Sequence, residues 1–187
     1  MLMTYPMNIA GLRRDLPLCP VNDSLYIGAF VMFGDVELTE HCAKALLERA
    51  PEYDVLITAE SKGIPLGYEM AKQNRDERYL VARKAPKLYM KNVFTVNVRS
   101  ITTAQQQMLC IDQDDADYMK GRRVLIVDDV ISTGESLRAV ETLVQKAGGN
   151  IVGKMAVLAE GDAANREDII FLEKLPLFHA DGTPIED

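Results

Sequence analysis

The chain has 187 residues, of which 48% are hydrophobic, and carries a formal net charge of −7 with an isoelectric point near 4.9. This composition suffices for one domain with its own core, which we expect over residues 1–187, and the acidic balance argues against a nucleic-acid-binding surface. Three widely spaced cysteines argue against a disulfide framework and favour a reducing, cytoplasmic compartment. The sequence predicts neither a secretory leader nor a membrane span, since no apolar run reaches the roughly 18 residues that a span needs.

The first half of the chain predicts alternating helices and strands after an irregular start. Residues 1–37 carry three prolines and predict little regular structure apart from a short strand within 25–33. The order that follows is typical of parallel strands joined by right-handed crossovers. The expected elements are a helix over 38–50, a strand over 53–59, a turn over 60–63, a helix over 64–74 and a strand over 79–82.

The second half begins with a different pattern. Residues 93–101 and 105–111 have no helix between them and predict a protruding antiparallel pair, followed by a solvated turn over 112–117. Helix and strand then alternate again, so the fold class is α/β, with a mostly parallel central sheet and helices on both faces. The remaining expected elements are a strand over 124–127, a polar turn over 132–134, a helix over 136–146 stopped by Gly148-Gly149, and strands over 151–158 and 169–172.

The most informative stretch is residues 124–136. Four apolar residues in a row predict a strand buried on both faces, which delivers Asp128 and Asp129 to a small polar turn and a helix. Open α/β sheets bind ligands at such junctions, and the unpaired N–H groups of a helix start favour an anion. Neighbouring acids would repel that anion unless they held hydroxyl groups or a metal ion. The alternative is that these residues serve only as turn and capping groups.

This stretch resembles the phosphoribosyl pyrophosphate signature of the type I phosphoribosyltransferases, which has four apolar residues, two acids, and then Thr-Gly with a small hydroxyl residue. The resemblance implies that Asp128 and Asp129 are the catalytic acids, which hold the ribose 2- and 3-hydroxyls. It also implies that the following loop binds the 5-phosphate through backbone N–H groups and hydroxyls, with the side chain of Glu135 pointing away. The implied loop residues are Val130, Ile131, Ser132, Thr133, Gly134, Glu135 and Ser136.

Two further clusters follow the ends of predicted strands. The first resembles the pyrophosphate-binding turn of the family and consists of Glu60, Ser61, Lys62 and Gly63; taken alone it would be a plain turn. The second resembles the basic cluster of adenine and xanthine phosphoribosyltransferases and consists of Arg83, Lys84 and Lys87; its alternative is a solvated basic face. The segment from Lys87 to about Ile111 would then be the flexible loop that closes over the reacting centre and excludes water.

Recognition of the base is expected in a small hood formed by residues from about 1–37 and about 160–187. Phe33-Gly34-Asp35-Val36 lies where adenine enzymes carry an aromatic residue, any residue, Asp and an apolar residue. By this resemblance Phe33 binds the base by stacking on the purine ring; the alternative is a core aromatic. The stretch 169–178 resembles the hood that both adenine and xanthine enzymes use.

The resemblance implies a purine phosphoribosyltransferase of the salvage pathway, with adenine favoured. It would transfer ribose 5-phosphate from phosphoribosyl pyrophosphate to a purine base, with Mg²⁺ held mainly by the substrate diphosphate and water. The sequence predicts no protein metal site, since the two histidines, His41 and His179, are isolated. A homodimer is usual in the family. The alternatives are a xanthine or guanine phosphoribosyltransferase, and a regulator that binds a nucleotide or phosphoribosyl pyrophosphate without catalysis.

Overall fold

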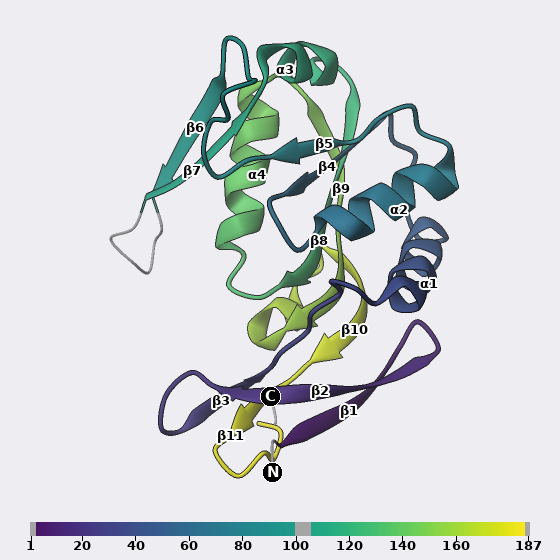
Figure 1. Cartoon of the computed structure of the whole chain (residues 1–187), viewed down its shortest axis with the longest axis vertical. Coiled ribbons are helices and arrows are strands. Elements are labelled where there is room, and N and C mark those ends of the chain that lie inside the picture. Colours follow the sequence, from purple (N-terminus) through teal and green to yellow (C-terminus); the bar gives the residue numbers. More distant parts are fainter. Residues whose placement is uncertain (1–2, 100–105, 186–187) are drawn as a thin grey trace.

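The computed structural model describes residues 3–99 and 106–185. Its centre is a five-stranded sheet in the order β10-β9-β8-β4-β5, and all four pairings are parallel (Figure 1). Parallel strands place all their carboxyl ends at one edge of the sheet, which is where a ligand site is expected. The strands are β4 (Val55–Ala59), β5 (Leu80–Ala82), β8 (Arg123–Ile131), β9 (Asn150–Glu160) and β10 (Ile170–Leu175).

Helices cover both faces of this sheet, which confirms the predicted fold class. α1 (Val36–Leu47) and α2 (Ile64–Asn74) pack on one face, while α3 (Gln113–Met119) and α4 (Glu135–Lys146) pack on the other. The apolar run of β8 serves both cores because successive side chains alternate in direction. Its members Val124 and Ile126 pack into the α4 core, and Leu125 and Val127 pack into the α1–α2 core.

A second, antiparallel sheet joins the two ends of the chain in the order β1-β2-β3-β11, below the main sheet in Figure 1. Its strands are β1 (Thr4–Ile9), β2 (Leu12–Pro20), β3 (Leu25–Gly28) and β11 (Leu177–His179). The prediction that residues 1–37 are largely irregular was therefore wrong. Ala10 and Gly11, both with positive φ, form a two-residue hairpin turn, and Pro6 lies on the edge strand, where proline is tolerated.

The predicted antiparallel pair is confirmed as the hairpin of β6 (Phe94–Arg99) and β7 (Gln106–Ile111). The hairpin lies alongside α4 (Figure 1), and Val96, Leu109 and Ile111 are buried in the α4 core. Residues 100–105 of the expected flexible loop lie outside the described residues. Closure of this segment over the site stays a prediction.

Two further differences from expectation are that β8 is longer than predicted and that a helix replaces a predicted turn. Helix α2 spans residues 64–74 as predicted, but β8 continues through both acids to Ile131 because it pairs with β9 as far as Ala159. The predicted turn over 112–117 is wrong: α3 forms there because Ala116 and Met119 are buried. None of the helices in the described ranges is long and apolar enough to cross a membrane.

Candidate active site

Two carboxylates and a helix start meet at the carboxyl end of β8. Asp128 and Asp129 occupy the sixth and seventh positions of this strand, and residues 132–136, here called the 132–136 loop, connect it to α4. Gly134 has φ 77° and is the residue before the first helical position, Glu135. The positive φ of Gly134 lets the backbone turn from the end of β8 directly into the first turn of α4.

A cavity of about 270 Å³ opens at this point. Three segments that are far apart in sequence line it: the turn after β4, the segment after β5, and the end of β8 together with the 132–136 loop. Most residues predicted for the site therefore line one space. They are Glu60, Ser61, Lys62, Lys84, Asp128, Asp129, Val130, Ile131, Ser132, Thr133, Gly134, Glu135 and Ser136, together with Ala59 and Leu137, which the sequence did not indicate.

The two acids of β8 have different surroundings. Asp129 is 3% exposed, and one of its oxygens lies 2.8 Å from the ammonium nitrogen of Lys62. Asp128 accepts a hydrogen bond from the backbone N–H of Asp129. Burial and the neighbouring carboxylate raise the pKa of Asp128 to about 7. One acid is therefore paired with a cation, while the pKa of the other is raised by burial and by its neighbour.

Gly63 keeps the turn after β4 close to these acids. A Cβ atom at this position would lie 2.1 Å from the buried hydroxyl of Thr58 and 3.2 Å from a carboxylate oxygen of Asp128. Any larger residue would push the turn away from the strand. Gly63 is not among the residues that line the cavity, and its role in binding pyrophosphate stays a prediction.

Glu60 is bonded to the basic segment that follows β5. Its carboxylate lies 3.3 Å from the guanidinium of Arg83 and 3.7 Å from the ammonium of Lys87, and it accepts the backbone N–H of Lys84. The last of these bonds is the main cause that lowers the pKa of Glu60. Of the three predicted cations, Lys84 lines the cavity, whereas Arg83 and Lys87 lie against Glu60. The sequence indicated these acids and bases but not that Glu60 holds the cations in place.

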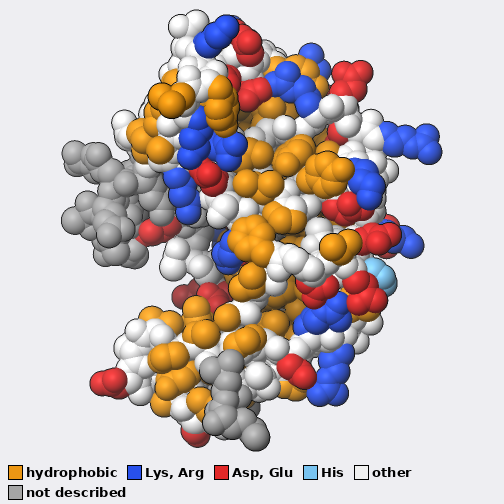
Figure 2. Space-filling view, in the orientation of Figure 1, with side chains coloured by type: hydrophobic (Ala, Val, Ile, Leu, Met, Phe, Trp, Pro, Cys, Tyr) orange, Lys and Arg blue, Asp and Glu red, His pale blue; other side chains and the backbone are white. Residues whose placement is uncertain are grey.

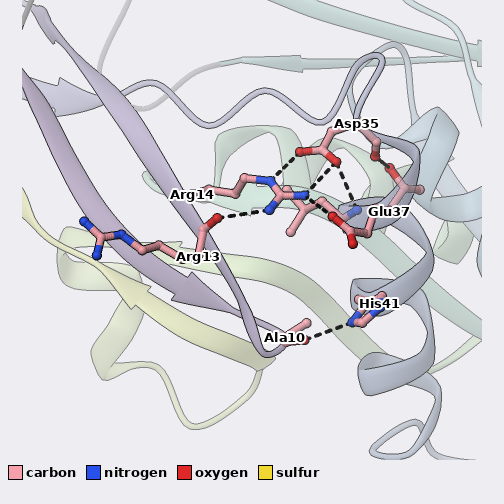
Figure 3. A network of polar contacts seen from close by, with 8 residues as sticks. Ala10, Arg13, Arg14, Asp35, Glu37 and His41 are labelled. Atoms are coloured by element: carbon pink, nitrogen blue, oxygen red, sulfur yellow. Dashed lines mark hydrogen bonds and ion pairs between the residues drawn. The ribbon is translucent and has the colours of Figure 1, made fainter.

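Phe33 lies apart from this cavity, on the segment that joins β3 to α1, with 52% of its surface exposed. The alternative of a core aromatic is therefore excluded. The segment is fixed by Arg14 of β2, whose guanidinium binds both oxygens of Asp35 at 2.7 and 3.1 Å and also reaches Glu37 (Figure 3). Asp35 in turn caps α1 by accepting the N–H of Leu38.

The electrostatics of the cavity restrict what it can bind. Its lining contains two cations, Lys62 and Lys84, against four acids, which are Glu60, Asp128, Asp129 and Glu135. A helix start favours an anionic group, whereas exposed faces of carboxylates favour hydroxyls or a cation. The arrangement suits a ligand that combines an anion with vicinal hydroxyls. No group of three or more metal-ligating side chains occurs among the residues that the structure describes.

Comparison with known proteins gives the family. Residues 37–180 match the phosphoribosyl transferase domain. Adenine phosphoribosyltransferase of Thermosipho africanus is 29% identical over 166 residues, covering 88% of this chain and 94% of that protein. The enzyme of the same name from Thermotoga maritima is 37% identical over 158 residues, covering 83% and 87%.

Solved structures agree with this match at the level of the fold. Adenine phosphoribosyltransferase of Rhodothermus marinus has a TM-score of 0.65 at 23% identity and covers 92% of this chain and 94% of that one. The Saccharomyces cerevisiae enzyme, complexed with an imino-altritol bisphosphate and adenine, has a TM-score of 0.60 at 19% identity and covers 91% and 92%. At these identities the structural likeness concerns the fold.

Proposed function

The chain belongs to the phosphoribosyl transferase domain family, and from this premise we propose the reaction that its cavity performs. The protein is a purine phosphoribosyltransferase, and adenine is the favoured base. It transfers ribose 5-phosphate from phosphoribosyl pyrophosphate to the base and releases pyrophosphate, a reaction of purine salvage. The observation that carries this proposal is the junction of two adjacent carboxylates, one buried and one partly buried, with a helix start in one cavity. The relatives named adenine phosphoribosyltransferase support the choice of base.

In this reaction the bond between the sugar C1 and the diphosphate oxygen breaks, and a bond from C1 to a ring nitrogen of the base forms. The electron pair of the broken bond leaves with the diphosphate, and the base nitrogen gives its proton to the diphosphate or to water. The sugar passes through a state that resembles an oxocarbenium ion. Asp128 and Asp129 hold the ribose hydroxyls, and their negative charge favours the positive charge that develops on the ring.

Different segments of the site bind the 5-phosphate and the diphosphate of the substrate. Backbone N–H groups and hydroxyls of the 132–136 loop bind the 5-phosphate, as expected for a helix start. Lys62 and Lys84 face the leaving diphosphate across the cavity, while Glu60 keeps Arg83 and Lys87 beside it. Lys62 must exchange its contact with Asp129 for the diphosphate, which would free that carboxylate for a hydroxyl.

The donor set of the cavity fits a Mg²⁺ ion that arrives with the diphosphate. Asp128 and Asp129 supply hard oxygen donors beside the anion site, but their number falls short of an octahedral shell, so substrate and water would complete it. When bound, the ion would neutralise charge on the leaving group. Loss of turnover in excess chelator and its return with added Mg²⁺ would test this assignment.

The base is proposed to lie between the main sheet and the hood, with Phe33 stacked on the purine ring. Phe33 is free to do so because half of its surface is exposed while Arg14 and Asp35 hold its segment in place. The hood is the four-stranded sheet of β1, β2, β3 and β11, so the whole chain acts as one unit.

A homodimer in the cytoplasm is the proposed working form. Large hydrophobic side chains are exposed at several places, and apolar patches occur on the face seen in Figure 2. Among these exposed side chains, Val36 lies on α1, Tyr68 lies on α2, and Leu88 and Tyr89 lie on the segment after β5. The three cysteines are free, which suits a reducing compartment. The molecular mass in solution tests the dimer.

The decisive experiment is a panel of adenine, hypoxanthine, guanine and xanthine, each incubated with phosphoribosyl pyrophosphate and Mg²⁺. Adenosine monophosphate is the expected product, with a kcat/KM for adenine well above that for the other bases. A preference for xanthine or guanine would change the base but keep the reaction. Absence of product from all four bases, with phosphoribosyl pyrophosphate still bound, would favour a regulatory protein instead.

A further inference from the structure

Arg166 is a cation that the proposed reaction leaves without a role, although it lies against the 132–136 loop. The position that a Cβ atom would take at Gly134 is 2.8 Å from the Nη1 atom of Arg166. Real Cβ atoms essentially never approach a neighbour so closely, so a side chain at position 134 would have to displace the guanidinium. Arg166 is close to the loop but is not among the residues that line the cavity.

The guanidinium is held in this place by a chain of alternating charges. Its Nε and Nη2 atoms donate to the two oxygens of Asp168 at 2.9 and 2.8 Å. Asp168 also binds Lys154 of β9, whose ammonium donates at 2.8 Å to Glu141 of α4. Lys154 is largely buried, with 16% of its side chain exposed, whereas 51% of the Asp168 side chain is exposed, so this chain of charges runs from the protein interior to the surface. Because the fork uses Nε and Nη2, the Nη1 end remains directed at Gly134.

The position of Arg166 matters because the cavity lining has more acids than cations. The lining is acidic, with four carboxylates against two lysines, yet the proposed ligand carries a phosphate dianion at the 132–136 loop. Lys62 is paired with Asp129, and Lys84 follows β5, so both serve the diphosphate side. Arg166 directs the positive end of its ion pair with Asp168 to the other side, next to the loop that has to accept the 5-phosphate.

We propose that Arg166 is a positioning residue for the 5-phosphate: it braces the 132–136 loop at Gly134 and supplies the cation that makes this loop selective for a phosphate dianion. This inference rests on the proposed function, since it assigns the 5-phosphate to that loop. Arg166 acts on the substrate by holding the 132–136 loop in place, and it does not contact the reacting atoms.

The test measures binding of ribose 5-phosphate, with ribose as the uncharged reference, by calorimetry and by ³¹P NMR titration of the bound phosphate. Arg166→Gln removes the charge, Arg166→Lys keeps the charge without the fork, and Asp168→Asn loosens the fork. Lys146→Gln is the matched control, because it removes the same charge from the exposed last turn of α4, at the end away from the loop. Melting temperatures of all variants accompany the binding data.

Arg166→Gln should weaken binding of ribose 5-phosphate about tenfold, as expected for loss of one charge near a dianion at the edge of solvent. It should also move the second ionisation of the bound phosphate back toward its value in free ribose 5-phosphate. Arg166→Lys should lie between this variant and the parent. Asp168→Asn loosens the fork but also removes a neighbouring negative charge, so its effect on binding should be smaller than that of Arg166→Lys. Lys146→Gln should match the parent. KM for phosphoribosyl pyrophosphate should rise while KM for the base stays the same.

Unchanged affinity and an unchanged phosphate ionisation in a folded Arg166→Gln variant would overturn the proposal. An equal loss of binding for ribose 5-phosphate and for the base would also overturn it, because that result describes general destabilisation. If Arg166→Gln does not fold, the proposal is tested by comparing ribose 5-phosphate binding of Arg166→Lys and Asp168→Asn with that of the parent. If the parent protein forms no nucleotide from any base, the binding measurement still tests Arg166, so the two failures remain distinct.

Discussion

The ammonium nitrogen of Lys62 lies 2.8 Å from a carboxylate oxygen of Asp129. This contact joins the turn after β4 to the strand β8, and it places a cation beside a carboxylate that is 3% exposed. A buried carboxylate requires such a partner, because a charge without one is costly in a protein interior. In the proposed reaction the same pair opens when the diphosphate arrives.

Removal of Lys62 should therefore cost stability as well as binding. Lys62→Met leaves Asp129 without its cation, and we expect the free energy of unfolding to fall by about 1–2 kcal/mol, at the lower end because Lys62 is half exposed. Adding Asp129→Asn should restore most of that loss but not turnover. Urea unfolding of the single and double variants measures the change in the free energy of unfolding. Lys72→Met, which breaks an exposed pair with Glu69 on α2, is the control and should change stability by less than about 0.5 kcal/mol.

Asp128 should make the ligand-free protein less stable as the pH rises. Its pKa is about 7 in the folded protein against an ordinary value of 3.8, so the unfolded chain loses the proton first. Stability from this group is complete below about pH 4 and is lost as the pH rises to about 7. Asp128→Asn should thus raise the melting temperature more at pH 8 than at pH 4, while turnover falls sharply at both. An equal change in melting temperature at the two pH values would contradict the raised pKa.

Arg83, which lies beside Glu60, should contribute to the binding of phosphoribosyl pyrophosphate. Arg83→Ala should raise KM for this substrate several-fold, and the effect should be larger at low salt because screening weakens an exposed charge. Steady-state kinetics at two ionic strengths measures the difference. Arg49→Ala, which removes an exposed cation bonded to the carbonyl of Phe171, provides the control. A KM that does not change at low salt would remove Arg83 from the site.

Gly134 should tolerate no side chain, for two separable reasons. Its φ of 77° strains any other residue, and a Cβ atom would meet Arg166. Gly121→Ala is a matched control, because Gly121 has φ 74° but nothing within 4 Å of the Cβ position. Both variants should lose about 1–2 kcal/mol of stability from backbone strain. Only Gly134→Ala should also weaken ribose 5-phosphate binding, as calorimetry would reveal; comparable binding by the two variants would refute the steric argument.

Phe33 should affect the base and not the fold. Since 52% of its surface is exposed, Phe33→Ala should change stability little, whereas loss of stacking should raise KM for adenine about tenfold. KM for phosphoribosyl pyrophosphate should stay near the parent value. Val21→Ala, at a similarly exposed apolar residue between β2 and β3, serves as the control. Equal KM values for adenine in the parent and in Phe33→Ala would place the base elsewhere.

The sequence alone was sufficient for the parallel sheet and for most of the residues that line the cavity. The run Val124–Val127 and the helix pattern of residues 64–74 are local signals, and the strands and helix they predict are present. Ala10-Gly11 is a local turn signal too, but the three prolines of residues 1–37 predicted irregular structure. Proline removes one backbone donor, and the sheet tolerates this for Pro6 because β1 is an edge strand.

The pairings across the site were decided by the tertiary structure. Residues such as Glu60 and Arg83, Lys62 and Asp129, or Gly134 and Arg166 are close because parallel strands bring their carboxyl ends to one edge, and the sequence carries no mark of which partners will meet there. Residue type and spacing determine which groups reach that edge. Their distances, burial and pKa values depend on how neighbouring strands and loops pack, which is a property of the folded chain.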